Sequence, residues 1–160
     1  MGCLKSKPPI IEASNGDGRM FGENFIVDRI LGSGEFGIVK LVHRKRDPHP
    51  PLACKLLRKG YHMDHNTLYA PTKPHILRNE VDILRVLNGE HHNLKLAEVY
   101  ESKSLIYIVT KYCEFELFEY VTACYGLSAG IKTEDVRRIA FELFDDIDHC
   151  VENGVIHRGM

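Results

Sequence analysis

The chain has 160 residues, of which 44% are hydrophobic and 27% are charged, a composition that fits one globular domain with a sizeable core. Its net charge of -1, without a basic stripe interleaved with aromatic residues, excludes a broad electrostatic attraction to nucleic acid. The five cysteines are scattered, odd in number and preceded by no secretory segment, which predicts a reduced, intracellular protein. The apolar run Leu105–Val109 is far too short to span a bilayer.

The first six residues fit the M-G-x-x-x-[ST] pattern for myristoylation of Gly2. Cys3 offers a neighbouring palmitoylation site, and two lysines follow it closely. Because a single acyl chain binds a membrane only marginally, stable anchoring depends on the second acyl chain and on the nearby cations. We therefore expect residues 1–22 to form an acylated, flexible tether and the protein to be cytoplasmic and membrane-associated. The alternative is a chance match at a disordered start.

A glycine-rich turn follows the tether. Gly32, Gly34 and Gly37 have G-x-G-x-x-G spacing, which lets backbone N–H groups approach phosphate oxygens. A dinucleotide site would need the glycines to lead from a strand into a helix. Here Phe25–Leu31 and Gly37–His43 are both rich in β-branched and apolar residues, so the glycines are predicted to join two strands.

A third strand, Pro51–Leu57, places Lys55 after the glycine turn, in a Leu-Ala-Cys-Lys sequence of the V-A-I-K type. The helix predicted over Pro74–Leu87 carries Glu80 in the middle of its apolar face. A buried carboxylate without a partner would cost several kcal/mol, so Lys55 is the expected partner. The alternative is a rim salt bridge worth under about 1 kcal/mol.

The remaining elements are predicted from the spacing of apolar residues and from the positions of turn residues. Gly60–His75 is expected to be an inserted loop, whose histidines lack metal-ligand spacing and are interpreted as solvated. Strands follow over Lys95–Tyr100 and Leu105–Lys111, which makes five strands and one helix by residue 111. Thr133–Asn153 is a long amphipathic helix with Thr133 as its expected N-cap.

A G-x-S-x-G sequence at Gly126–Gly130, with Ser128 in its centre, fits the nucleophile elbow of esterases. That motif needs a strand before the serine and a helix directly after it. Here it falls in a loop between two helices, so a hydrolase is not expected.

From Phe25 onward the chain resembles the protein kinase family, and most of all its calcium/calmodulin-dependent and calcium-dependent Ser/Thr branch. The resemblance rests on the glycine turn, Lys55 and the stretch Ile106–Cys113 with Glu116–Val121. It implies an α+β fold, in which a small lobe of a five-stranded antiparallel sheet plus one helix spans residues 23–112. Residues 113–160 would be the hinge and the first helices of an incomplete large lobe.

The resemblance also implies site roles. Lys55 and Glu80 would form the Lys–Glu pair that holds the lysine at the α- and β-phosphates of ATP. Thr110 would be the gatekeeper, Lys111 and Cys113 would offer backbone groups to adenine, and Glu116 would reach the ribose. The full predicted nucleotide-binding set is Leu31, Gly32, Ser33, Gly34, Phe36, Gly37, Val39, Ala53, Lys55, Thr110, Lys111, Cys113 and Glu116.

The last residues, Val155–Met160, resemble the start of the H-R-D catalytic loop, with Gly159 where the aspartate should be. In the family that aspartate accepts the substrate proton, while a later asparagine and the D-F-G aspartate hold Mg²⁺. We therefore expect a truncated, ATP-binding kinase lobe that does not transfer phosphate, with the apolar stripe of its last helix partly exposed. The alternative is a non-catalytic, membrane-tethered, pseudokinase-like interaction module. The protein substrate is left open.

Overall fold

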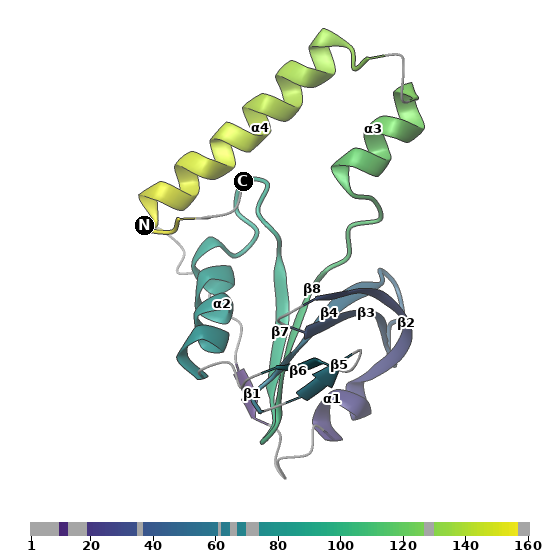
Figure 1. Cartoon of the computed structure of the whole chain (residues 1–160), viewed down its shortest axis with the longest axis vertical. Coiled ribbons are helices and arrows are strands. Elements are labelled where there is room, and N and C mark those ends of the chain that lie inside the picture. Colours follow the sequence, from purple (N-terminus) through teal and green to yellow (C-terminus); the bar gives the residue numbers. More distant parts are fainter. Residues whose placement is uncertain are drawn as a thin grey trace.

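The computed structural model describes residues 10–12, 19–34, 37–60, 62–64, 67–69, 74–126 and 130–156. Within these ranges a twisted six-stranded sheet, in the order β1-β7-β8-β4-β3-β2, forms the body of the molecule, and the two C-terminal helices extend away from it (Figure 1). The elements are β1 (Ile10–Glu12), α1 (Arg19–Asn24), β2 (Phe25–Gly34), β3 (Gly37–Arg44), β4 (Leu52–Arg58), β5 (His62–Asp64), β6 (Thr67–Tyr69), α2 (Pro74–Leu87), β7 (Leu96–Glu101), β8 (Leu105–Lys111), α3 (Leu117–Tyr125) and α4 (Thr133–Glu152).

The five predicted strands pair in an antiparallel sheet, which confirms the α+β small-lobe architecture. The bounds of α2 and β8 agree with the predicted ones to the residue. Both segments have a strong pattern, since α2 carries an apolar stripe at helical spacing and β8 is a run of apolar and β-branched residues. The predicted loop at residues 60–75 contains the separate hairpin β5–β6.

The N-terminal part contains two elements, β1 and α1, that were not predicted from the sequence. β1 pairs in parallel with β7, and α1 leads directly into β2. Phe21 of α1 is buried in the core. The expectation that residues up to 22 form a flexible tether outside the core is therefore wrong for β1 and α1.

The core is divided between the two faces of the sheet, because successive side chains of a strand point to opposite faces. On β8, Tyr107 and Val109 belong to the cluster on one face, and Ile106 and Ile108 belong to the cluster on the other. The first cluster also contains Phe21, Phe25, Val42, Leu52, Cys54 and Tyr100, and the second contains Leu57, Leu77, Val81, Leu96 and Val99. Thus α1 covers one face and α2 covers the other.

The two C-terminal helices, α3 and α4, bury few of their side chains. Every residue of α3 is at least partly exposed, and within the described length of α4 only His149 is buried. The apolar stripe of α4 is partly exposed, as expected. The N-cap of α4 is Lys132, so the prediction of Thr133 was wrong by one residue; Thr133 is the first helical residue. Within the described part of the chain, no helix is both long enough and apolar enough to cross a membrane.

Candidate nucleotide site

The site begins with an ion pair between the sheet and α2. Lys55 Nζ lies 2.7 Å from Glu80 Oε1 and 2.9 Å from Glu80 Oε2. Lys55 is on β4, on the same side as Leu57, and this side faces α2. The pairing expected from the sequence is therefore present. The expected burial is not, because the Lys55 and Glu80 side chains are 32% and 35% exposed. The pair is part-buried, and solvent screening at this exposure keeps its contribution to about 1 kcal/mol, so it fixes the lysine amine in position more than it stabilises the fold.

The glycine-rich turn connects β2 to β3, with Gly34 opposite Gly37 and Gly32 opposite Val39. Gly37 has a φ of 148°, and a Cβ there would lie 2.0 Å from the Leu56 carbonyl oxygen. Close approach of the β3 and β4 backbones therefore requires glycine at this position, whatever binds there. A Cβ added at Gly32 or Gly34 would meet no heavy atom within 4 Å, so the backbone there is open to a ligand. The predicted ligand residue Phe36 lies outside the described residues.

Cross-strand pairing places most of the remaining predicted residues on the same face of the sheet. Val39 is opposite Lys55, and Ala53 is opposite Thr110. Residues directly opposite one another in a sheet share a face, as do residues two apart in one strand. Val39, Ala53, Lys55 and Thr110 therefore line the α2 face together, beside Gly32. Thr110 is buried, and Val39 and Ala53 are half-buried.

The residues after β8 are arranged differently. The Lys111 amide donates to the Lys95 carbonyl oxygen at 2.9 Å, so this amide is already used by the fold. Cys113 is exposed. Glu116, expected at the ribose, is the N-cap of α3, where its own amide donates to Glu119 Oε2 at 3.3 Å. The structure thus groups the sheet residues of the predicted site tightly and leaves Cys113 and Glu116 on the connection to α3.

One contact near this connection was not predicted. Arg29 Nη2 of β2 lies 3.5 Å from Tyr112 Oη, so the strand before the glycine turn reaches the segment after β8. No sequence pattern links two residues that are 83 positions apart.

The groups available at this site fit the phosphates of a nucleotide better than they fit a metal ion without a nucleotide. Open glycine backbone and a lysine held by a carboxylate match the needs of phosphate oxygens. Among the described residues, no three His, Cys, Asp or Glu side chains are grouped as metal ligands. The predicted lipidation residues Gly2 and Cys3, the motif serine Ser128 and the catalytic-loop Gly159 lie outside the described residues.

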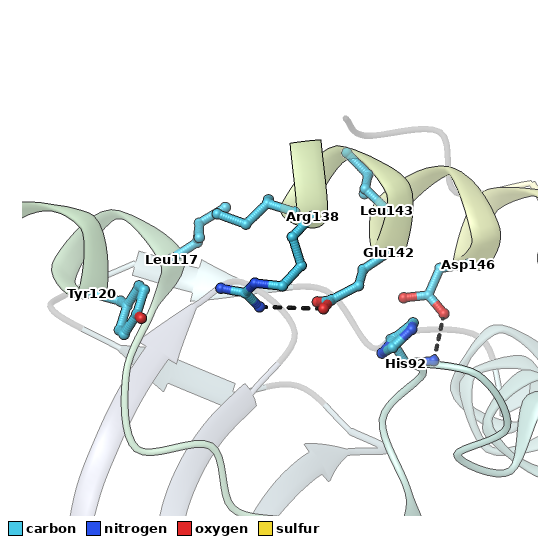
Figure 2. Close-up of a pocket in the computed structure, with 8 residues that line it drawn as sticks. His92, Leu117, Tyr120, Arg138, Glu142, Leu143 and Asp146 are labelled. Atoms are coloured by element: carbon cyan, nitrogen blue, oxygen red, sulfur yellow. Dashed lines mark hydrogen bonds and ion pairs between the residues drawn. The ribbon is translucent and has the colours of Figure 1, made fainter. Parts of the chain in front are cut away.

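A second concave region lies away from this site. An open groove of about 510 Å³ lies between α3, α4 and the loop that joins α2 to β7. Figure 2 shows the residues that line it. Its lining residues are His92, Leu117, Tyr120, Arg138, Ile139, Glu142, Leu143 and Asp146, none of which was predicted to bind nucleotide. Arg138 Nη1 lies 3.2 Å from Glu142 Oε1 within α4. The groove is therefore a feature of the helices and not part of the Lys55–Glu80 site.

Polar contacts hold α4 against the same loop. Asp146 Oδ1 accepts from the His92 amide at 2.9 Å and from Asn93 Nδ2 at 3.1 Å. His91 Nδ1 lies 2.6 Å from Asp145 Oδ2, and its ring is 4.4 Å from that of His149. The hydrogen bond to Asp145, together with the nearby carboxylates, raises the pKa of His91. We call these contacts the α4 latch.

The part of the chain that resembles known proteins begins at the first residue of β2. Residues 25–160 match the protein kinase domain family. The chain is 27% identical over 135 residues to serine/threonine-protein kinase SIK2 from Gallus gallus, which covers 84% of this chain and 15% of the relative. It is 30% identical over 140 residues to probable serine/threonine-protein kinase MARK-A from Dictyostelium discoideum, covering 86% of this chain and 12% of the relative.

Serine/threonine protein kinase OSK3 from Oryza sativa subsp. indica is 30% identical over 139 residues, covering 86% of this chain and 25% of the relative. The chain therefore spans a quarter or less of the length of these three curated relatives. The match to the family extends from the first strand of the antiparallel sheet through α4. With the lysine–glutamate pair, the glycine turn and the sheet order in place, this chain belongs to the protein kinase domain family.

Proposed function

We propose that this chain is the ATP-binding part of a Ser/Thr protein kinase-like domain. The observation that carries the proposal is the contact of Lys55 Nζ with both carboxylate oxygens of Glu80, on the sheet face that also carries Gly32, Ala53 and Thr110. Ser/Thr specificity is supported by the names of the relatives. The assignment to the calcium-dependent branch is supported only by resemblance around the hinge.

In this proposal, the chain's own residues bind and orient the nucleotide. The open backbone at Gly32, Ser33 and Gly34 receives phosphate oxygens, while Leu31, Val39 and Ala53 pack on the purine. Lys55, held by Glu80, neutralises charge on the α- and β-phosphates. ATP with Mg²⁺ would supply the transferable phosphoryl group and the counter-charge.

The test is thermal denaturation with and without MgATP. Saturating ligand is expected to raise the Tm of the native chain by several degrees, because it binds the folded state alone. Lys55→Ala should abolish most of that rise. The matched control is Lys59→Ala, since Lys59 also pairs with a glutamate, Glu101, at 2.6 Å but outside the proposed site. An equal rise in the native and Lys55→Ala proteins, or no rise at all, would contradict nucleotide binding at this site.

We further propose that the chain does not transfer phosphate, on the ground that Gly159 cannot act as the proton acceptor that the family's aspartate provides. A radiolabelled ATP assay on a panel of Ser- and Thr-containing peptides should show no incorporation. Incorporation by the native chain that disappears in Lys55→Ala would refute this part of the proposal.

Membrane attachment is a separate proposal, supported by the sequence at Gly2 and Cys3. After expression in a eukaryotic cell, the native chain is expected to float with membranes. Gly2→Ala should release it entirely, and Cys3→Ser should weaken its retention, because a single acyl chain binds marginally. Equal flotation of all three proteins would exclude dual acylation as the anchor.

The second candidate function is a non-catalytic interaction module. It is favoured by the exposed apolar side chains of α4, which include Phe141, Leu143, Phe144 and Val151. Contiguous exposed apolar surface is typical of protein interaction sites. Failure of the MgATP test, together with stoichiometric binding of a protein partner that is lost in Phe144→Ser, would favour this function over the first.

A further inference from the structure

Phe21 of α1 belongs to a cluster of aromatic side chains on the face of the sheet opposite the proposed nucleotide site. Its ring is stacked on Tyr107, with centroids 4.6 Å apart, and on Phe25 at 5.1 Å. Tyr100 meets it edge-on at 5.7 Å. The Phe21 side chain is only 5% exposed. Stacked and edge-on aromatic contacts of this kind add to the free energy of area burial and restrict the orientation of the ring.

Hydrogen bonds fix α1 at two further places. Asn24 Nδ2 donates to Tyr100 Oη of β7 at 3.2 Å. Lys45, just after β3, donates from Nζ to the Gly22 carbonyl oxygen at 2.6 Å and from its amide to the Asn24 carbonyl oxygen at 2.9 Å. The short helix is therefore tied both to β7 and to the end of β3, the strand that pairs with β2.

Two side-chain contacts restrain the middle of β2, the strand that carries the glycine turn: Asp28 lies 3.6 Å from His43, and Arg29 lies 3.5 Å from Tyr112. β2 is an edge strand of the described sheet and pairs with β3 alone. The pairing has two register shifts, between Val27 and Ile30 and between Ile30 and Gly32. The residues from Ile26 to Ile30 are all exposed. The buried anchor of this strand is Phe25, which follows α1 without a linker and stacks on Phe21.

We propose that Phe21 is a positioning residue for the nucleotide site. By docking α1 on the outer face of the sheet, it fixes the start of β2, and β2 in turn sets the position of the glycine turn at Gly32–Gly34. Phe21 thereby influences a site on the face of the sheet opposite its own. This inference rests on the proposed function only in naming a nucleotide as the ligand of the turn.

The test combines site-resolved amide hydrogen exchange with calorimetric titration of MgATP, at a temperature where each protein is fully folded. In Phe21→Ala, exchange from Ile30 to Gly34 should be about tenfold faster, whereas exchange in α2, which packs on the other face of the sheet, should change less. The Kd for MgATP should rise about three- to tenfold, the size of coupling usually transmitted through a packed element. Phe21→Leu, which keeps an apolar side chain, should restore most of both properties.

The matched control is Ile106→Ala, which removes a buried side chain from the other face. It should lower the Tm without changing exchange at the glycine turn. Unchanged exchange at Gly32–Gly34 in Phe21→Ala, or equal acceleration there in Phe21→Ala and Ile106→Ala, would overturn the proposal.

Two arrangements keep the test decisive. If Phe21→Ala does not fold, Asn24→Ala removes the hydrogen bonds to Tyr100 Oη and to the Met20 carbonyl oxygen and should shift exchange and Kd in the same direction by a smaller factor; no shift at all would count against the proposal. If the native chain binds no MgATP, the proposed function fails, and the exchange measurement alone decides whether Phe21 positions the turn.

Discussion

The sheet and the two C-terminal helices are held in different ways. The sheet has an apolar cluster on each face, with side chains such as Val42, Cys54 and Leu57 completely buried. In the described parts of α3 and α4, by contrast, His149 is the single buried residue. The contacts of α4 with the rest of the chain are largely polar and include those of the α4 latch. The difference indicates that burial determines the stability of the sheet, whereas hydrogen bonds and ion pairs determine the placement of α4.

The largest expected contrast is in cysteine reactivity. Cys54 is fully buried, and burial raises the pKa of its thiol to about 12, whereas Cys113 and Cys124 are exposed. Alkylation of Cys54 should wait for opening of the sheet and be roughly a thousandfold slower than alkylation of the exposed pair. Mass spectrometry of timed iodoacetamide reactions measures this. Similar rates for all three thiols would show that the sheet opens as easily as the helices.

A core truncation should show the next largest contrast. Leu57→Ala removes a side chain that is 0% exposed and is expected to lower the free energy of unfolding by about 2–5 kcal/mol. Leu143→Ala on α4, where the side chain is 51% exposed, should cost about 0.5 kcal/mol or less. Urea denaturation followed by circular dichroism compares the two variants. Equal costs would mean that α4 packs as tightly as the sheet does.

Breaking the α4 latch should have a smaller and local effect. Asp146→Ala removes the acceptor of the His92 amide and of Asn93 Nδ2, contacts that together contribute about 1–2 kcal/mol. Amide exchange should accelerate in α4 and in residues 90–94 and stay native in β4 and β8. Asp148→Ala, at an exposed position of the same helix, is the control. Acceleration throughout the sheet would show that the two regions unfold as one unit.

The smallest effect is a pH dependence of the latch. The hydrogen bond to Asp145 raises the pKa of His91, so the folded chain binds the proton more tightly than the unfolded chain does. The resulting stabilisation is fully present below the unfolded pKa of about 6.5 and is lost as the pH rises through the higher folded pKa. An NMR titration of the His91 ring should show the raised pKa, and Asp145→Asn should lower it. An identical titration curve in both proteins would remove Asp145 as the cause.

Sequence patterns within single elements predicted most of the fold and the Lys55–Glu80 pair at the centre of the site. The stripe of α2 and the run of β8 determined their bounds, and helical spacing placed Glu80 on the face that meets Lys55. No comparable signal marks α1, because Phe21 is a single aromatic residue in a polar, glycine-rich stretch. β1 is only three residues long and is stabilised by pairing with β7, a partner almost 90 positions away.

The sequence left open whether the Lys55–Glu80 pair is buried or lies at a rim, and it did not indicate the α4 latch around Asp145. Both depend on how separate elements sit against each other, and periodicity within one element does not report that arrangement. The prediction of Thr133 as the N-cap of α4 was wrong for another reason, because sequence patterns determine the ends of a helix least well. Lys132 occupies the N-cap position and makes no side-chain cap hydrogen bond.

The short strand β1 has a consequence for solubility. Unpaired strand edges act as templates on which another chain can add a strand, and covering an edge is one way in which proteins avoid this. By lying along β7, the three residues of β1 shield part of one edge of the described sheet and leave β2 at the other, where Asp28 and Arg29 place charges in the middle of the strand. Adding a strand at this edge would remove water from these charged side chains, which disfavours the addition. The sheet is therefore protected at one edge by its own N-terminal residues and at the other by charge.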